Sequence, residues 1–159
     1  MKKSKSLRVR LDVILKDAES ESKIMRESSS LNNLLSTENS TNSTPKYSQI
    51  GLNYYNKGEY DKAIESFQKA LHSEGESASV HYNLGLAYQA KGLLDEAARE
   101  YKKSLELNPL DAEAHNNLGI IYYTKVNYKK AVQEFRLAIS INPDLKIARK
   151  NLELLEEKG

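Results

Sequence analysis

The sequence has no cysteine, no long apolar run and almost no excess charge. The absence of cysteine excludes disulfide scaffolds, zinc ribbons, iron–sulfur clusters and thiol nucleophiles. No apolar stretch approaches the ~18 residues that a membrane-spanning helix needs. The 159 residues include 24 lysines and arginines and 22 acidic residues, so the net charge is only +2. This near balance argues against a protein that binds nucleic acid through its overall charge.

Aromatic residues are also absent from the first part of the chain, because none lies before Tyr47. Within residues 27–44, 13 of 18 side chains are serine, asparagine or threonine. Such a segment cannot bury enough apolar surface to offset ~1–2 kcal/mol of backbone entropy per residue. We therefore predict a mostly disordered tail over residues 1–43 and a folded domain over residues 44–159. The tail carries the whole net charge of +2, and the folded domain is neutral.

One part of the tail is periodic, with Leu7, Leu11, Ile14, Leu15 and Ala18 on a single helical face. This pattern predicts a short amphipathic helix over residues 7–18. A lone helix of this length is unstable in water. It therefore either stays nascent or folds against a partner or against a groove of this protein, and the pattern leaves both readings open.

The basic N-terminus lacks the uninterrupted apolar stretch of a secretory signal. An organelle presequence has the support of the basic first residues, but the acidic residues from Asp12 onward count against it. We therefore expect a cytoplasmic protein.

The remainder of the chain repeats with a period of 34 residues, and six columns share this interval with only conservative changes. Chance does not produce six coincident columns, so the repeat decides the architecture. The columns are Gly51, Gly85 and Gly119; Tyr54, Tyr88 and Tyr122; Ala63, Ala97 and Ala131; Phe67, Tyr101 and Phe135; Ala70, Ser104 and Ala138; and Leu71, Leu105 and Ile139.

Each repeat reads as two helices joined by a tight turn. In residues 78–111, apolar residues recur at helical spacing up to Gly92, which ends the first helix. A second apolar face follows Asp95, an acid suited to the first turn of a helix. Asn108 and Pro109 end this second helix, because proline lacks an N–H and pushes the preceding residue away from α geometry. Such a helix pair leaves one side uncovered unless a neighbour stacks on it.

This pattern resembles the tetratricopeptide repeat, and the resemblance covers residues 44–145. It divides them into repeats 44–77, 78–111 and 112–145, followed by a capping helix over residues 146–158. The resemblance implies an all-α, right-handed α-solenoid of three helix–turn–helix repeats, with seven helices in all. Three repeats are the minimum for a stable stack.

One position departs from the pattern. Val126 occupies the column in which the earlier repeats carry Gly58 and Gly92. A β-branched residue does not easily adopt the left-handed conformation that glycine allows. We therefore predict that the third turn between helices differs from the first two.

The resemblance also implies a concave groove, lined by the first helix of each repeat, that holds an extended peptide or a partner helix. One row of this groove consists of amides spaced by 34 residues, and these could pair with a peptide backbone or satisfy neighbouring groups and water. A second row is apolar, and it either contacts ligand or packs the repeats together. The implied groove residues are Gln49, Asn83, Asn117 and Asn151 in the amide row; Leu52, Leu86, Ile120 and Leu154 in the apolar row; and Tyr55, Tyr82, Tyr123 and Lys150 beside them.

Some members of this family clamp the C-terminal carboxylate of chaperones with lysine, asparagine and arginine side chains at set columns. Of the five columns, only Asn83 matches here, so no cation is available to neutralise a carboxylate. The resemblance therefore argues against a ligand of that kind. The five columns hold Ser48, Leu52, Asn83, Glu113 and Asn117.

The sequence contains no phosphate-binding loop, HExxH motif or GxSxG motif. His81 and His115 occupy equivalent repeat columns, so we interpret them as structural rather than catalytic or metal-binding. Paired lysines such as Lys102 and Lys103 are mixed with acidic residues and indicate a solvated face rather than a nucleic-acid site. We expect no catalytic residue, metal or cofactor.

The sequence thus favours a protein–protein interaction module that acts as a scaffold or adaptor. The alternative is a regulatory or assembly factor whose basic N-terminal helix docks on a membrane surface, on an anionic partner or in the groove of a second copy. In the last case the protein would be a homo-oligomer.

Overall fold

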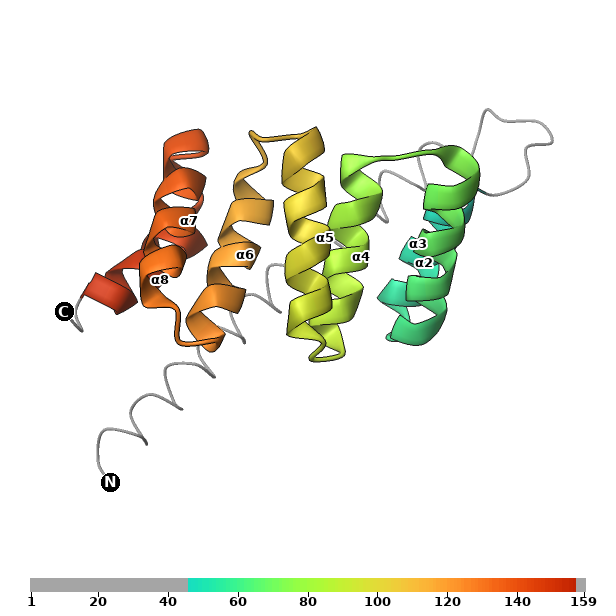
Figure 1. Ribbon diagram of the computed structural model, residues 1–159, viewed down its shortest axis with the longest axis horizontal. Coiled ribbons are helices and arrows are strands. Elements are labelled where there is room, and N and C mark those ends of the chain that lie inside the picture. The colour runs from blue at the N-terminus through green and yellow to red at the C-terminus, as the bar shows by residue number, and fades with distance from the viewer. Residues whose placement is uncertain (1–45, 157–159) are drawn as a thin grey trace, which may run out of the picture. The chain divides into compact units, whose positions relative to one another are not determined.

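The computed structural model describes residues 46–156. Seven helices and no strand lie within this range (Figure 1). The predicted tail, its helix over residues 7–18 and the last residues of the predicted capping helix lie outside the described residues. The helices are α2 (Tyr47–Asn56), α3 (Tyr60–Glu74), α4 (Ala78–Ala90), α5 (Leu94–Leu107), α6 (Ala112–Thr124), α7 (Tyr128–Ile141) and α8 (Lys146–Glu156).

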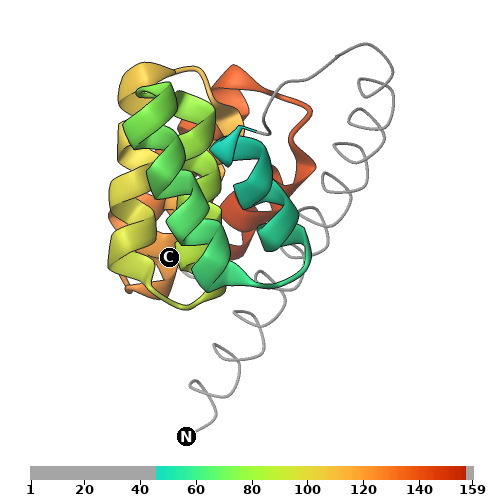
Figure 2. The same ribbon diagram turned by 90° about the vertical axis from the view of Figure 1, so that its right-hand side faces the viewer.

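Consecutive helices form the antiparallel pairs α2/α3, α4/α5 and α6/α7, and these pairs stack side by side along one axis (Figure 1). The helix α8 follows the last pair at the end of the row. When the stack is viewed from the other direction, α3 and α5 lie on one side and α2 and α8 on the opposite side (Figure 2). This arrangement confirms the prediction of an all-α solenoid of paired helices.

Glycine allows the two helices of each pair to approach closely. A methyl group placed on Gly85 would lie 2.8 Å from the ring of Tyr101, so the ring occupies the space that any side chain would need. Tyr101 is completely buried, and its hydroxyl donates a 2.9 Å hydrogen bond to Gln89 on the first helix. The glycine and aromatic columns of the repeat therefore describe one contact. The same contact joins Gly51 to Phe67 and Gly119 to Phe135.

The third turn has the same backbone conformation as the other two, so the prediction that it differs is wrong. Val126 has a φ of 62°, close to the 78° of Gly58 and the 76° of Gly92. Its N–H donates to the carbonyl of Tyr123 at 3.0 Å, as the N–H of Gly58 donates to its own preceding turn. The backbone hydrogen bonds and the packing of α6 on α7 hold Val126 in the left-handed region. Its exposed side chain leaves it no compensating contact, because 67% of its surface faces solvent.

The two histidines at the repeat period tie the first helix of a pair to the second. Nδ1 of His81 lies 2.7 Å from a carboxylate oxygen of Glu100, and Nδ1 of His115 lies 2.7 Å from Glu134. The two glutamates are themselves 34 residues apart. The hydrogen bond to Glu134 raises the pKa of His115 above its usual value, although partial burial opposes this shift. These contacts support the structural interpretation of both histidines.

Candidate functional site

The first helices of successive repeats lie against one another. Nδ2 of Asn117 on α6 donates to the hydroxyl of Tyr82 on α4 at 3.1 Å, and Nδ2 of Asn151 on α8 donates to Oδ1 of Asn116 on α6 at 3.1 Å. The predicted groove residues all belong to these first helices. They are Gln49, Leu52 and Tyr55 on α2; Tyr82, Asn83 and Leu86 on α4; Asn117, Ile120 and Tyr123 on α6; and Lys150, Asn151 and Leu154 on α8.

Burial separates this predicted set into two groups. One group is half-buried or exposed and presents its side chains to solvent. The other group is buried, and most of its members make contacts within the protein. The first group is Gln49, Leu52, Tyr82, Asn83, Leu86, Lys150 and Leu154; the second is Tyr55, Asn117, Ile120, Tyr123 and Asn151.

The four amides of the predicted row are therefore not equivalent. Asn117 and Asn151 already donate to neighbouring first helices. Asn83 is half-buried, and its side chain makes no hydrogen bond to any residue in the described range. The same holds for Gln49 at the other end of the row. Asn83 is thus the central amide whose donors and acceptor are available to a ligand.

Tyr82 is held rigidly beside this amide. Its ring packs against the ring of Tyr101, with centroids 5.7 Å apart and a 52° tilt. Its hydroxyl accepts the hydrogen bond from Asn117 and lies 3.5 Å from a carboxylate oxygen of Glu113. Burial and then the nearby carboxylate of Glu113 raise the pKa of Tyr82 far above the usual phenol value. Tyr82 therefore stays neutral at all ordinary pH values.

The other two groove tyrosines also pack against a second tyrosine near the following turn. Tyr55 lies 5.5 Å from Tyr60 and Tyr123 lies 5.6 Å from Tyr128, measured between ring centroids. Both pairs are tilted, a geometry that favours contact between a ring edge and a ring face. These contacts fix Tyr55 and Tyr123 at the ends of their helices.

Sequence reasoning missed Asn116, which receives the hydrogen bond from Asn151 and is itself buried. Asn116 stands in the column that holds Tyr82 one repeat earlier. That change, from an aromatic residue to an amide beside the amide row, is the signal that could have identified it.

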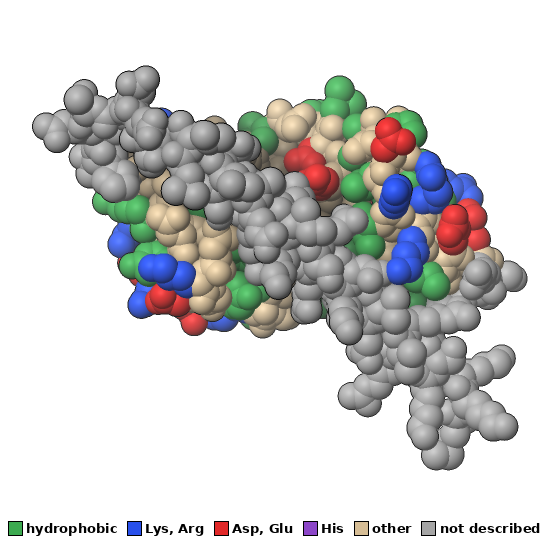
Figure 3. Space-filling view, turned by 180° about the vertical axis from the view of Figure 1, so that it is seen from behind, with side chains coloured by type: hydrophobic (Ala, Val, Ile, Leu, Met, Phe, Trp, Pro, Cys, Tyr) green, Lys and Arg blue, Asp and Glu red, His purple; other side chains and the backbone are tan. Residues whose placement is uncertain are grey.

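Charged side chains of both signs lie close to one another on the face shown in Figure 3. Several form ion pairs, including Lys69 with Glu65 at 2.6 Å and Arg136 with Glu156 at 2.9 Å. Among the described residues, no group of three or more histidine, aspartate or glutamate side chains is arranged to hold a metal ion. No helix between residues 46 and 156 is both long and apolar enough to cross a membrane.

Comparison with known families and structures agrees with this architecture. Residues 82–145 match a family model described as tetratricopeptide repeat, and residues 51–92 match one described as TPR repeat. No curated protein matches the sequence. Since the two models together extend from residue 51 to residue 145 and the fold is the one they describe, the chain is a tetratricopeptide repeat protein.

Solved structures of similar fold include the TPR domain of Arabidopsis OM64. It is 22% identical with a TM-score of 0.67, and the alignment covers 70% of this chain and 92% of that one. The second TPR domain of human RPAP3, solved in complex with the HSP70 peptide SGPTIEEVD, is 21% identical with a TM-score of 0.66 and coverages of 70% and 92%. MamA is 28% identical with a TM-score of 0.68 and coverages of 70% and 66%.

Proposed function

We propose that this protein is an interaction module, a scaffold or adaptor, that holds an extended peptide or a partner helix along the groove of α2, α4, α6 and α8. The observation that carries the proposal is the half-buried, unpaired side chain of Asn83 at the centre of that groove. An amide that is left without a partner on a rigid helix is ready to bond to a peptide backbone.

The residues around Asn83 suit a peptide ligand. Leu86 lies one turn further along α4, and Leu52 occupies the equivalent position on α2. Both are half-buried, so each offers an apolar contact to a ligand side chain. Tyr82 adds a neutral, rigidly held ring, which binds a ligand with little loss of side-chain entropy.

The chemistry of the groove also favours one class of peptide over another. The human RPAP3 domain is solved with a chaperone peptide, whereas here the five columns of the chaperone clamp match only at Asn83. Glu113 stands in one of these columns and would repel a carboxylate. We therefore propose that the ligand is an internal segment of its partner rather than a C-terminal carboxylate.

The experiment begins with selection of peptides from a displayed random library against the full chain. The affinity of each selected peptide is then measured for Asn83→Ala and for Gln133→Ala, a matched amide deletion on the exposed surface of α7. We expect Asn83→Ala to weaken binding at least tenfold and Gln133→Ala to leave it unchanged. Equal affinities for the two variants would show that the groove is not the binding site.

The alternative function, in which a basic N-terminal helix docks on a membrane, an anionic partner or a second copy, depends on residues outside the described range. It stays a hypothesis. The variant Leu11→Glu places a charge in the apolar face of that segment, so it should abolish vesicle binding or self-association if the alternative holds. Light scattering and vesicle sedimentation with the full chain measure these two outcomes.

A further inference from the structure

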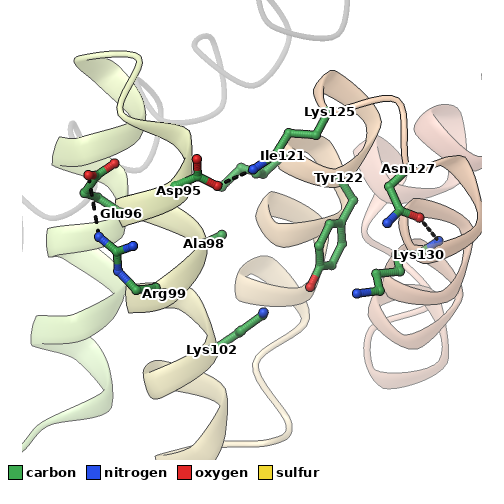
Figure 4. A pocket seen from close by; sticks show the side chains of 10 residues that line it. All are labelled: Asp95, Glu96, Ala98, Arg99, Lys102, Ile121, Tyr122, Lys125, Asn127 and Lys130. Carbon is green, nitrogen blue, oxygen red and sulfur yellow. Dashed lines mark hydrogen bonds and ion pairs between the residues drawn. The ribbon is translucent and has the colours of Figure 1, made fainter.

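A second cleft lies between the second and third repeats, away from the predicted groove residues. Tyr122 of α6 stands in it between Lys102 of α5 and Lys130 of α7 (Figure 4). Ala98 and Ile121 contribute its apolar lining, and its volume is about 590 Å³. We call this feature the Tyr122 cleft.

Two ammonium groups flank the same aromatic ring. Nζ of Lys130 lies 5.3 Å from the centroid of Tyr122, and Nζ of Lys102 lies 5.9 Å from it. Neither lysine forms an ion pair with any carboxylate in residues 46–156, and the hydroxyl of Tyr122 has no hydrogen-bond partner there. The remaining cations of the cleft are neutralised, since Arg99 pairs with Glu96 and Lys125 with Asp95. The two free ammonium groups therefore make the cleft positive.

The preceding repeat shows what this position looks like when packing alone decides it. Thirty-four residues earlier, Gln68 and Glu96 stand in place of the two lysines, and Tyr88 stands in place of Tyr122. Nε2 of Gln68 donates to the hydroxyl of Tyr88 at 3.1 Å, so the equivalent tyrosine is satisfied inside the protein. The stack thus does not need lysine at either column. Both cations are specific to the Tyr122 cleft.

We propose that the Tyr122 cleft binds an acidic segment of a partner protein in an extended conformation. Both ammonium groups lie within 6 Å of one ring centroid, so they are separated by the width of a single ring and its contacts. In an extended chain, side chains two residues apart project from the same face about 7 Å apart. Two such carboxylates can reach Lys102 and Lys130 while the chain between them crosses the ring of Tyr122.

The charges around the cleft favour a peptide over a nucleic acid. Asp95 and Glu96 line the same cleft and would repel a continuous polyanion. A peptide with spaced acidic residues can place neutral side chains next to these carboxylates. Lysine suits this ligand because its ammonium is a mobile point charge that follows a flexible partner.

The test uses the full chain and a labelled peptide of alternating glutamate and serine, with binding followed by fluorescence anisotropy at low ionic strength. We expect saturable binding that weakens as salt is added, and no binding of the same peptide with glutamine in place of glutamate. The cleft variant Lys102→Gln/Lys130→Glu carries the residues of the preceding repeat at both columns and should lose at least tenfold in affinity.

A matched control removes the same charge one residue away. Lys103 and Lys129 neighbour the two cleft lysines in sequence but do not line the cleft, and Lys103 lies 3.8 Å from Glu100. The variant Lys103→Gln/Lys129→Glu should bind the peptide as the natural chain does. Asn83→Ala should also bind it normally, which separates this site from the groove. Equal losses in both lysine double variants, or competition by single-stranded nucleic acid that exceeds competition by the unlabelled peptide, would overturn the proposal.

Discussion

Nδ2 of Asn151 on α8 donates a 3.1 Å hydrogen bond to Oδ1 of Asn116 on α6, while its own Oδ1 is buried without a donor in the described part of the protein. The side chain of Asn151 is completely buried, and that of Asn116 is almost so. A buried acceptor that has lost its hydrogen bond to water costs ~1–3 kcal/mol. The pair therefore connects the last helix to the third repeat at an energetic cost.

We predict that removing both amides is better tolerated than removing one. Asn151→Leu alone strands the carbonyl oxygen of Asn116 and should lower the free energy of unfolding by about 1–2 kcal/mol. The double variant Asn116→Leu/Asn151→Leu buries two apolar side chains of similar size and should recover most of that loss. Urea denaturation of the natural chain, both single variants and the double variant measures the coupling. Additive losses would contradict this prediction.

The turn at Val126 gives a second prediction, because a non-glycine residue is held there at a φ of 62°. Val126→Gly removes the strain of this conformation, ~1–2 kcal/mol, but adds entropy to the unfolded chain worth ~0.5–1 kcal/mol. We expect a net gain in stability of about 0.5–1 kcal/mol, seen as a higher melting temperature.

The matched control is Gly92→Val at the same column, where an added Cβ would meet no atom within 4 Å. Any loss of stability in this variant therefore comes from the backbone and not from a clash. We expect a loss of ~1–2 kcal/mol. If Val126→Gly proves destabilising, the valine makes a contribution that its exposed position does not show.

The glycine at the centre of each helix pair gives a third prediction. Gly85→Ala places a methyl group 2.8 Å from the ring of Tyr101, and the buried ring has no free space into which to move. We expect overpacking to cost ~1–3 kcal/mol of unfolding free energy. In a Tyr101→Leu background the same substitution should cost distinctly less, and a thermal-denaturation cycle of the four proteins measures the difference.

The fold was predictable because the 34-residue period carries the same physical information three times. Each glycine column marks a close approach, each aromatic column fills it, and the two columns together give the helix pairs. The turn at Val126 could not be predicted this way, because local propensity is weaker than the hydrogen bonds and packing on both sides of the turn.

The candidate site was only partly predictable, for a different reason. A repeat column fixes where a side chain starts but not which neighbour it meets. Asn83 and Asn117 share a column, yet Asn117 meets a tyrosine hydroxyl and Asn83 meets no partner in the described range. The Tyr122 cleft escaped prediction because Lys102 and Lys130 are far apart in sequence and meet only when α5 and α7 pack around α6.

The last prediction concerns pH and rests on His115. Nδ1 of this histidine lies 2.7 Å from Glu134, and Nε2 lies 3.2 Å from the carbonyl oxygen of Pro109, so both ring nitrogens face acceptors. The hydrogen bond to Glu134 is the main cause of its raised pKa. A histidine whose pKa is higher in the folded than in the unfolded state stabilises the fold through its protonated form. This stabilisation is complete below the unfolded value of 6.5 and disappears as the pH rises through the folded pKa.

The variant His115→Gln cannot titrate, so its unfolding free energy should lack this component. We expect the difference in stability between the natural chain and the variant to be largest near pH 5.5 and to shrink steadily toward pH 8.5, as measured by urea denaturation across that range. The control is His72→Gln, because His72 is exposed near the end of α3. A difference that stays constant with pH would mean that the contact between His115 and Glu134 does not depend on the charge of the imidazole.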